Sequence, residues 1–191
     1  NGVAITFFNA ENAVLAGAEV EGIMNLSRIS ESLNKWSLGA NATFMYSKVD
    51  RSAEQLEQEK PVNFSESLKD RKLQGAAPWA VNADLKYEYK NGQNLPQTMS
   101  LVYNVSGSKI FTVGTSGLDH IYERPFHQLD FVYNTQITKN WNLKFGVLNL
   151  LNSTYKLELG EDGYIPLDVR TVTHTDFKRG TTFNFTAGYT F

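Results

Sequence analysis

The three histidines are the side chains of this sequence best suited to proton transfer or ligand binding, because imidazole titrates near neutral pH and readily binds metals. His120 and His174 fall in long polar segments, where each could serve as an axial ligand to a haem iron. The more ordinary interpretation of both is a polar residue on an exposed loop. His127 begins a strand pattern, where an amphipathic ring suits a boundary between water and an apolar phase.

Nucleophilic and metal-assisted catalysis lack their usual sequence signatures. The chain has no Gly-x-Ser-x-Gly elbow, no His-Glu-x-x-His helix and no cysteine. Disulfides and thiolate metal sites are therefore excluded. We predict a protein that is not an enzyme and that needs no cofactor.

Charged residues at alternate positions form the other candidate site. Glu19 and Glu21 project from one face of a strand, two residues apart, and could coordinate a cation; the more ordinary interpretation is a pair of charges facing water. The same alternation places four further charges on the corresponding face of other strands: Asp84, Lys86, Asp130 and Lys144. We expect all six to face the lumen of a barrel, because a charge near the midplane of the lipid face costs about 2–4 kcal/mol.

Alternation of apolar and polar residues is the strongest pattern in the sequence, and it predicts the β-strands that position these charges. Between residues 36 and 46, for example, every even position is apolar and nearly every odd position is small or polar. The pattern predicts seven strands, at residues 16–26, 36–46, 79–89, 99–106, 128–134, 141–147 and 182–191. The longer runs match a tilted strand that crosses a bilayer, about 9–11 residues, rather than a soluble strand of about 5–6.

The connections between these strands alternate in length. Short connections are expected at residues 28–35, 90–96 and 136–140, and long ones at 48–78, 107–124 and 152–180. Outer-membrane β-barrels have short periplasmic turns and long external loops, so the long segments are predicted to lie outside the cell. The segment 53–59 is a candidate helix within the first long connection.

Aromatic residues gather at both ends of the predicted strands, as in the two girdles of a membrane β-barrel. The clearest members are Trp36, Tyr89, Tyr133 and Trp141 at the short-turn ends, and Tyr46 and Trp79 at the long-loop ends. A soluble β-sandwich or lipocalin-like barrel is the alternative, but its apolar faces would turn inward and give aromatics no reason to collect at both ends.

The composition agrees with a membrane-spanning sheet and excludes other classes. The 191 residues carry 18 Lys and Arg against 20 Asp and Glu, a balance that argues against nucleic-acid binding. No apolar run approaches the roughly 18 residues of a spanning helix. A membrane β-barrel alternates its apolar residues with polar ones, so a mean hydropathy of −0.34 does not exclude it.

An odd number of strands does not suit a complete bacterial barrel, which closes with an even number. Seven strands therefore predict one sector of a larger barrel. The chain also starts at Asn1 with no signal peptide, and residues 3–8 read as the tail of a preceding strand or loop. We expect an excerpt of a longer protein.

Four stretches, in order, resemble the C-terminal part of TonB-dependent outer-membrane receptors. They are residues 10–21 with their Gly-x-Glu-x-Glu ending, 71–78 before a descending strand, the Asn-Leu segment 147–152, and the final strand that runs from Arg179 and Gly180 to Phe191. The resemblance covers essentially all 191 residues. It implies an all-β fold: about seven antiparallel strands of a 22-stranded transmembrane barrel, with residues 1–191 as its C-terminal portion and the plug domain absent from this chain.

The resemblance also implies location and partners. A receptor of this family, possibly of the Bacteroidetes type, would lie in the outer membrane of a Gram-negative bacterium and contact lipid, its own plug domain, the TonB complex through a missing N-terminal region, and the barrel assembly machinery. The terminal strand would carry the assembly signal, in Phe183, Phe185, Tyr189 and Phe191. Phe191 could equally be an interface anchor.

The function that follows is the TonB-energised import of a scarce ligand such as a metal chelate, haem, cobalamin or a glycan. Aromatic and basic residues of the segment 107–124 suit ligand capture at the barrel mouth, although simple loop decoration is the more ordinary interpretation: Phe111, His120, Tyr122 and Arg124. The alternative function is a small standalone outer-membrane barrel with an adhesive, scaffolding or lipid-hydrolysing role. A soluble ligand-binding barrel is a third.

Overall fold

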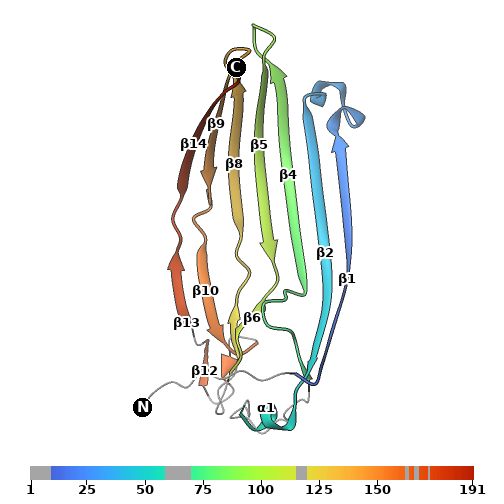
Figure 1. Ribbon diagram of the computed structural model, residues 1–191, viewed down its shortest axis with the longest axis vertical. Coiled ribbons are helices and arrows are strands. Elements are labelled where there is room, and N and C mark those ends of the chain that lie inside the picture. Colours follow the sequence, from blue (N-terminus) through green and yellow to red (C-terminus); the bar gives the residue numbers. More distant parts are fainter. Residues whose placement is uncertain (1–9, 59–69, 115–119, 162–163, 166–167, 172) are drawn as a thin grey trace.

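One long antiparallel sheet dominates the computed structural model, which describes residues 10–58, 70–114, 120–161, 164–165, 168–171 and 173–191 (Figure 1). Seven strands follow one another across it in the order of the chain: β1 (Asn12–Asn25), β2 (Trp36–Asp50), β4 (Trp79–Lys90), β5 (Pro96–Ser106), β8 (Gln128–Gln136), β9 (Trp141–Leu148) and β14 (Thr182–Tyr189). The all-β antiparallel architecture and its seven long strands confirm the prediction. The sheet is not closed, since β1 and β14 lie at opposite edges.

The register between strands keeps apolar residues in line across the sheet. Phe44 faces Trp79, Leu38 faces Leu85, and Leu85 in turn faces Leu101. The alternation read from each strand separately therefore joins into one continuous apolar face and one continuous polar face. Side chains directly opposite each other on one face contact across the strands, so this matching stabilises the register.

The short connections are tight turns held by their own side chains. Residues 26–35 contain two 3-10 helices, η1 (Leu26–Arg28) and η2 (Glu31–Leu33), and the Asn25 side chain accepts a hydrogen bond from the Ser27 amide at 2.9 Å. In the next turn, Asn91 Oδ1 accepts from the amides of Gln93 and Leu95, both at 3.0 Å. All three short turns lie at one end of the sheet (Figure 1).

The long connections contain strands that the sequence analysis read as loops. β6 (Lys109–Thr112), β7 (Ile121–Glu123), β10 (Thr154–Leu159) and β13 (Thr173–Lys178) form a second sheet in the order β13-β10-β7-β6. Each follows or precedes a strand of the main sheet after a short break, so the order repeats that of β14-β9-β8-β5. We call this second sheet the extension sheet. Its strands have only three to six residues, too few for local alternation to reveal them.

Smaller elements complete the long-loop end. β3 (Asp70–Arg71) pairs with β2, and β11 (Tyr164–Ile165) pairs with β12 (Asp168–Thr171). The helix α1 (Ala53–Gln58) lies where a helical segment was expected. In the part of the chain described, no helix has the length and apolarity needed to cross a membrane.

The break between β9 and β10 is built by asparagines with left-handed backbone. Asn149 has φ 56° and Asn152 has φ 45°, a conformation that asparagine tolerates better than most residues. The Asn149 side-chain nitrogen donates to the Gly180 carbonyl at 2.8 Å, and the backbone carbonyl of Asn149 accepts from the Thr181 hydroxyl at 3.1 Å. Asn149 therefore joins the β9–β10 break to the break before β14.

Buried apolar side chains are concentrated at the long-loop end: Val49, Val105, Ile110, Tyr122, Val147, Tyr155 and Leu157. The main sheet itself is a single layer and leaves large apolar residues uncovered. Val20 is 68% exposed and Phe183 69% exposed. An apolar surface this continuous requires an apolar phase or partner.

Candidate functional site

The polar face of the main sheet carries the six charged residues that the sequence analysis assigned to it: Glu19, Glu21, Asp84, Lys86, Asp130 and Lys144. Their cross-strand neighbours are mostly small or polar. Glu21 faces Asn41, and Lys86 lies between Ser37 and Ser100. The register thus gathers charges from four different strands onto one surface.

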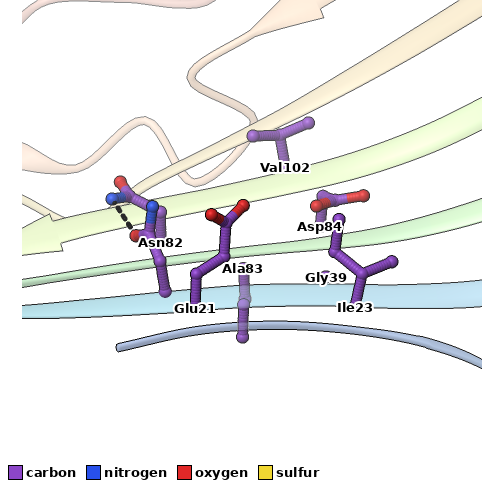
Figure 2. A pocket seen from close by; sticks show the side chains of 9 residues that line it. Glu21, Ile23, Gly39, Asn82, Ala83, Asp84 and Val102 are labelled. Atoms are coloured by element: carbon purple, nitrogen blue, oxygen red, sulfur yellow. Dashed lines mark hydrogen bonds between the residues drawn. The ribbon is translucent and has the colours of Figure 1, made fainter. Parts of the chain in front are cut away.

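A shallow hollow on this face lies over β1, β2, β4 and β5 (Figure 2). Figure 2 shows the carboxylates of Glu21 and Asp84 standing on the same side of the sheet as Asn82. Gly39, opposite Asp84, leaves room for that carboxylate, because a Cβ at this position would collide with Asp84 Oδ1. The hollow offers two carboxylates and neighbouring amides to a polar or cationic partner.

A row of amide side chains crosses the same face. Asn82 Nδ2 donates to Asn41 Oδ1 at 2.7 Å. Asn104 lies opposite Asn82, and Gln128 lies opposite Asn104. Each amide was at a polar-face position in the sequence, but the row exists only through the register of four strands, so sequence reasoning missed it.

Asp130 has a more specific environment than a free lumenal charge. Its Oδ1 accepts from the backbone N–H of Asn149 at 2.8 Å, and Gln128 Nε2 donates to Oδ2 at 2.9 Å. The carboxylate therefore holds the end of β9 where the break to β10 begins.

The side chain of Arg124 forms three hydrogen bonds with residues 158–161 at the long-loop end of the sheet. Its Nε donates to Glu158 Oε2 at 2.5 Å, and its Nη2 donates to the Gly160 carbonyl at 3.1 Å. A third hydrogen bond reaches the carbonyl of Glu161. This residue, predicted to capture ligand, joins the β7 region to the end of β10.

Other contacts tie a third connection to the same place. Lys72 forms an ion pair with Glu161. Gln74 Nε2 donates to the Phe111 carbonyl at 2.8 Å, and the Gly75 amide donates to the Ile110 carbonyl at 2.9 Å. The connection after β2 is therefore attached both to the β6 edge of the extension sheet and to the segment after β10.

The remaining predicted mouth residues differ in accessibility. Tyr122 is only 6% exposed, whereas Phe111 is 47% exposed. His120 is partly exposed, and its Nδ1 accepts from the Gly114 amide at 3.0 Å. The side chain of His174 lies outside the described residues. Ligand binding by the four mouth residues stays a prediction.

Aromatic side chains collect at both ends of the main sheet, as the sequence indicated. At the short-turn end, the ring of Trp36 lies 4.8 Å from that of Tyr87, whose neighbour is Tyr89 at 5.6 Å. Tyr133, on the same face, donates its hydroxyl to Gln97 at 2.8 Å. At the long-loop end, Phe44 faces Trp79 and Tyr46 faces Ala16.

The final strand presents its aromatic residues on the apolar face. Phe183 and Phe185 face Val147 and Phe145 of β9. The Tyr189 ring lies 5.0 Å from Trp141 and 5.1 Å from Phe191, just beyond the strand end. These residues therefore form one exposed aromatic strip that ends at the short-turn rim.

Two groups at the long-loop end have shifted pKa values. Hydrogen bonds to Asp50 and Asp70 raise the pKa of Lys48, which lies 3.1 Å from Asp50 and 3.2 Å from Asp70. Burial, and secondly a hydrogen bond with Glu123, raise the pKa of Tyr155. The described residues contain no cluster of three or more His, Cys, Asp or Glu suited to a metal ion.

Comparison with known proteins decides the family. The family model of the TonB dependent receptor-like β-barrel matches residues 1–150. This chain belongs to the TonB-dependent receptor family. No curated protein and no solved structure matches it. TonB-dependent receptors are outer-membrane transport proteins of Gram-negative bacteria, not enzymes, and they act with TonB and a plug domain.

Membership in this family explains the two faces of the open sheet. In a TonB-dependent receptor barrel the apolar face contacts lipid and the polar face lines the lumen. The match agrees with the resemblance of the sequence motifs, and its 150 residues include β1 to β9.

Proposed function

We propose that this chain is the C-terminal sector of a receptor that imports a scarce ligand, using energy delivered by TonB. The ligand classes that fit are a metal chelate, haem, cobalamin or a glycan. The observation that carries the proposal is the single-layered sheet, apolar on one face and charged on the other, within a chain matched by the receptor family.

The two open edges of the sheet support the proposal that further strands pair with it. The edge strands β1 and β14 are separated by five others, and bare strand edges cannot be solvated by lipid. We propose that the remaining strands of a 22-stranded barrel close it. The charges and amides of the polar face then contact the plug domain, the hollow at Glu21 and Asp84 receiving cationic or hydrogen-bonding groups.

External ligand capture is proposed for the accessible part of the mouth. Phe111 is exposed and His120 is partly exposed, while Tyr122 is buried and Arg124 is bonded to Glu158. Ligands that combine flat apolar and polar surfaces suit such a pair.

The test uses the full-length receptor. Binding is measured against ferric siderophores, haem, cobalamin and a set of oligosaccharides, and uptake of any ligand bound is compared in cells with and without TonB. We expect tight binding of one class and loss of its uptake without TonB. Uptake that is unaffected by removing either the receptor or TonB would contradict the proposal.

The final aromatic strip is proposed to be read by the barrel assembly machinery. We expect Phe191→Ser to lower the amount of folded receptor in the outer membrane several-fold, while Phe111→Ser, which removes an exposed aromatic ring at the opposite end, leaves it unchanged. Quantitative blotting of outer-membrane fractions measures both. Equal amounts of Phe191→Ser and unaltered receptor would reject a recognition role.

A further inference from the structure

An arginine near the start of the last strand lies against two aromatic rings. The guanidinium carbon of Arg179 is 4.6 Å from the centroid of the Tyr155 ring and 5.1 Å from that of Phe126. The two rings are themselves 6.2 Å apart. We call Phe126 and Tyr155 the aromatic platform. Phe126 lies in the link between β7 and β8, Tyr155 lies in β10, and Arg179 lies just before β14.

The backbone beneath this arginine is held in place. Gly180, the next residue, has φ 79°, and its carbonyl accepts from Asn149 Nδ2 at 2.8 Å. Thr181 is bonded to the Asn149 carbonyl at 3.1 Å. These hydrogen bonds fix the backbone next to Arg179, and the aromatic platform restricts the position of its guanidinium group.

The Arg179 guanidinium has no acid to neutralise it among the described residues. The side chain is exposed, and its contacts in this part of the chain are the two rings. Glu123, the carboxylate that shares a hydrogen bond with Tyr155, also forms an ion pair with Lys109 at 3.2 Å. Arg124 provides the contrast, since it is saturated by Glu158 and two carbonyl groups.

Stacking leaves the donors of an arginine free. The aromatic rings contact the guanidinium face, while its five N–H groups point outward in the plane and match the oxygens of a phosphate or carboxylate. Because the platform restricts the side chain beforehand, less conformational entropy is lost when an anion binds. If Arg179 only held these segments together, its exposed charge would not need to lack an acidic partner among the described residues.

We propose that Arg179, ordered by the aromatic platform, binds the phosphate or carboxylate group of an anion. The anion comes either from the headgroup of an outer-membrane lipid or from a soluble compound at the mouth. Both present the same oxygens to the guanidinium, and the experiment separates them. The site does not depend on the proposed import function.

The full-length receptor is studied in two arms, with Arg179→Gln as the test variant. In neutral detergent, calorimetric titration with inorganic phosphate reports a soluble anion. In phosphatidylcholine bilayer discs prepared with and without lipopolysaccharide, native mass spectrometry reports bound lipid. We expect Arg179→Gln to weaken binding about tenfold in one arm, because the substitution removes one charge-assisted hydrogen-bonding group. Arg28→Gln, an exposed arginine of the opposite end, should bind as the unaltered receptor does.

The two arms give distinct outcomes. Loss in the phosphate arm assigns a soluble anion, and loss in the lipopolysaccharide arm assigns a lipid headgroup. Binding by Arg179→Gln that equals the unaltered receptor in both arms overturns the proposal. A heat-dependent shift in gel mobility shows whether Arg179→Gln folds. If it does not fold, the two binding measurements are repeated with Phe126→Leu, which keeps the charge of Arg179 and removes half of the aromatic platform. A severalfold weakening is then expected, and unchanged binding in both arms overturns the site. Neither arm measures import.

Discussion

Arg124 and Arg179 look alike in the sequence, since both lie in long connections, but their surroundings differ. Arg124 donates to Glu158 and to two carbonyl groups, so its charge is used within the protein. Arg179 lies against two aromatic rings, and no hydrogen bond or ion pair joins its guanidinium to another residue that the structure describes. The sequence analysis selected Arg124 as a ligand-binding candidate because it lies with aromatic residues in the segment 107–124, and that role stays a prediction.

Replacing Arg124 tests its structural role. Arg124→Gln leaves the carboxylate of Glu158 without its partner, and that side chain is only 13% exposed. We expect a local destabilisation of about 1–3 kcal/mol, the usual result of stranding a largely buried acceptor. Hydrogen exchange of residues 120–124 and 154–161 in the full-length receptor measures it. Adding Glu158→Gln should recover part of the loss, and exchange rates that do not change would exclude the role.

Tyr155 provides a pH-dependent test. Burial and the hydrogen bond with Glu123 raise its pKa above the ordinary 10.0. A pKa that is higher in the folded state means that this group's contribution to stability is complete below pH 10.0 and is lost as pH rises through the folded value. An alkaline absorbance titration of the receptor minus that of Tyr155→Phe should show phenolate forming above pH 10.0. Ionisation at or below that pH would contradict the shift.

Among the elements, β1 and β2 make the longest pairing, and glycines on β1 mark where they approach. A Cβ on Gly17 would lie 2.7 Å from the Phe44 carbonyl oxygen, which the paired backbone cannot move aside. A Cβ on Gly22 would meet nothing within 4 Å. A side chain is therefore sterically excluded at Gly17 but has room at Gly22.

The pair Gly17→Ala and Gly22→Ala makes this contrast measurable. We expect Gly17→Ala to destabilise the receptor by about 1–3 kcal/mol, as overpacking does. Gly22→Ala should be neutral or stabilising by about 0.5–1 kcal/mol, because glycine weakens a strand interior. Urea unfolding of the receptor in lipid bilayers compares them. Equal effects of the two substitutions would show that the close approach at Gly17 has no energetic weight.

The main sheet, which makes up most of the molecule, is a single layer with one apolar face and one polar face. Leu101 and Val102 are consecutive residues of β5 that point to opposite sides: Leu101 lies between Leu85 and Phe131, and Val102 between Asp84 and Asp130. Only the apolar side needs a lipid environment.

An arginine scan of these two positions tests the orientation of the entire sheet. Leu101→Arg should destabilise the barrel by about 2–4 kcal/mol, the cost of a charge facing lipid near the midplane. Val102→Arg should be tolerated, because its charge would lie between Asp84 and Asp130 on the polar face. Unfolding in bilayers of defined thickness measures both free energies. A larger loss from Val102→Arg would reverse the assignment of the faces.

The amino-acid sequence by itself determined the strands and their two faces. In an extended backbone successive side chains point to opposite sides, so the alternation around Phe44 or Asp84 carries its own structural meaning. Short turns were equally readable, because Asn91 and its neighbours form their hydrogen bonds within a few residues. For the same reason the six polar-face charges were placed on one face from parity alone.

The tertiary structure decided everything that joins distant segments. The pairing of β7 with β10, the Asn41–Asn82 hydrogen bond, the Arg124–Glu158 pair and the platform under Arg179 connect residues more than twenty positions apart. Such contacts depend on the register of several strands at once, and a shift of one residue in any strand would turn its side chains to the other face. Local alternation assigns each residue to a face but does not say which residues of neighbouring strands pair, so these contacts are defined only in the assembled sheet.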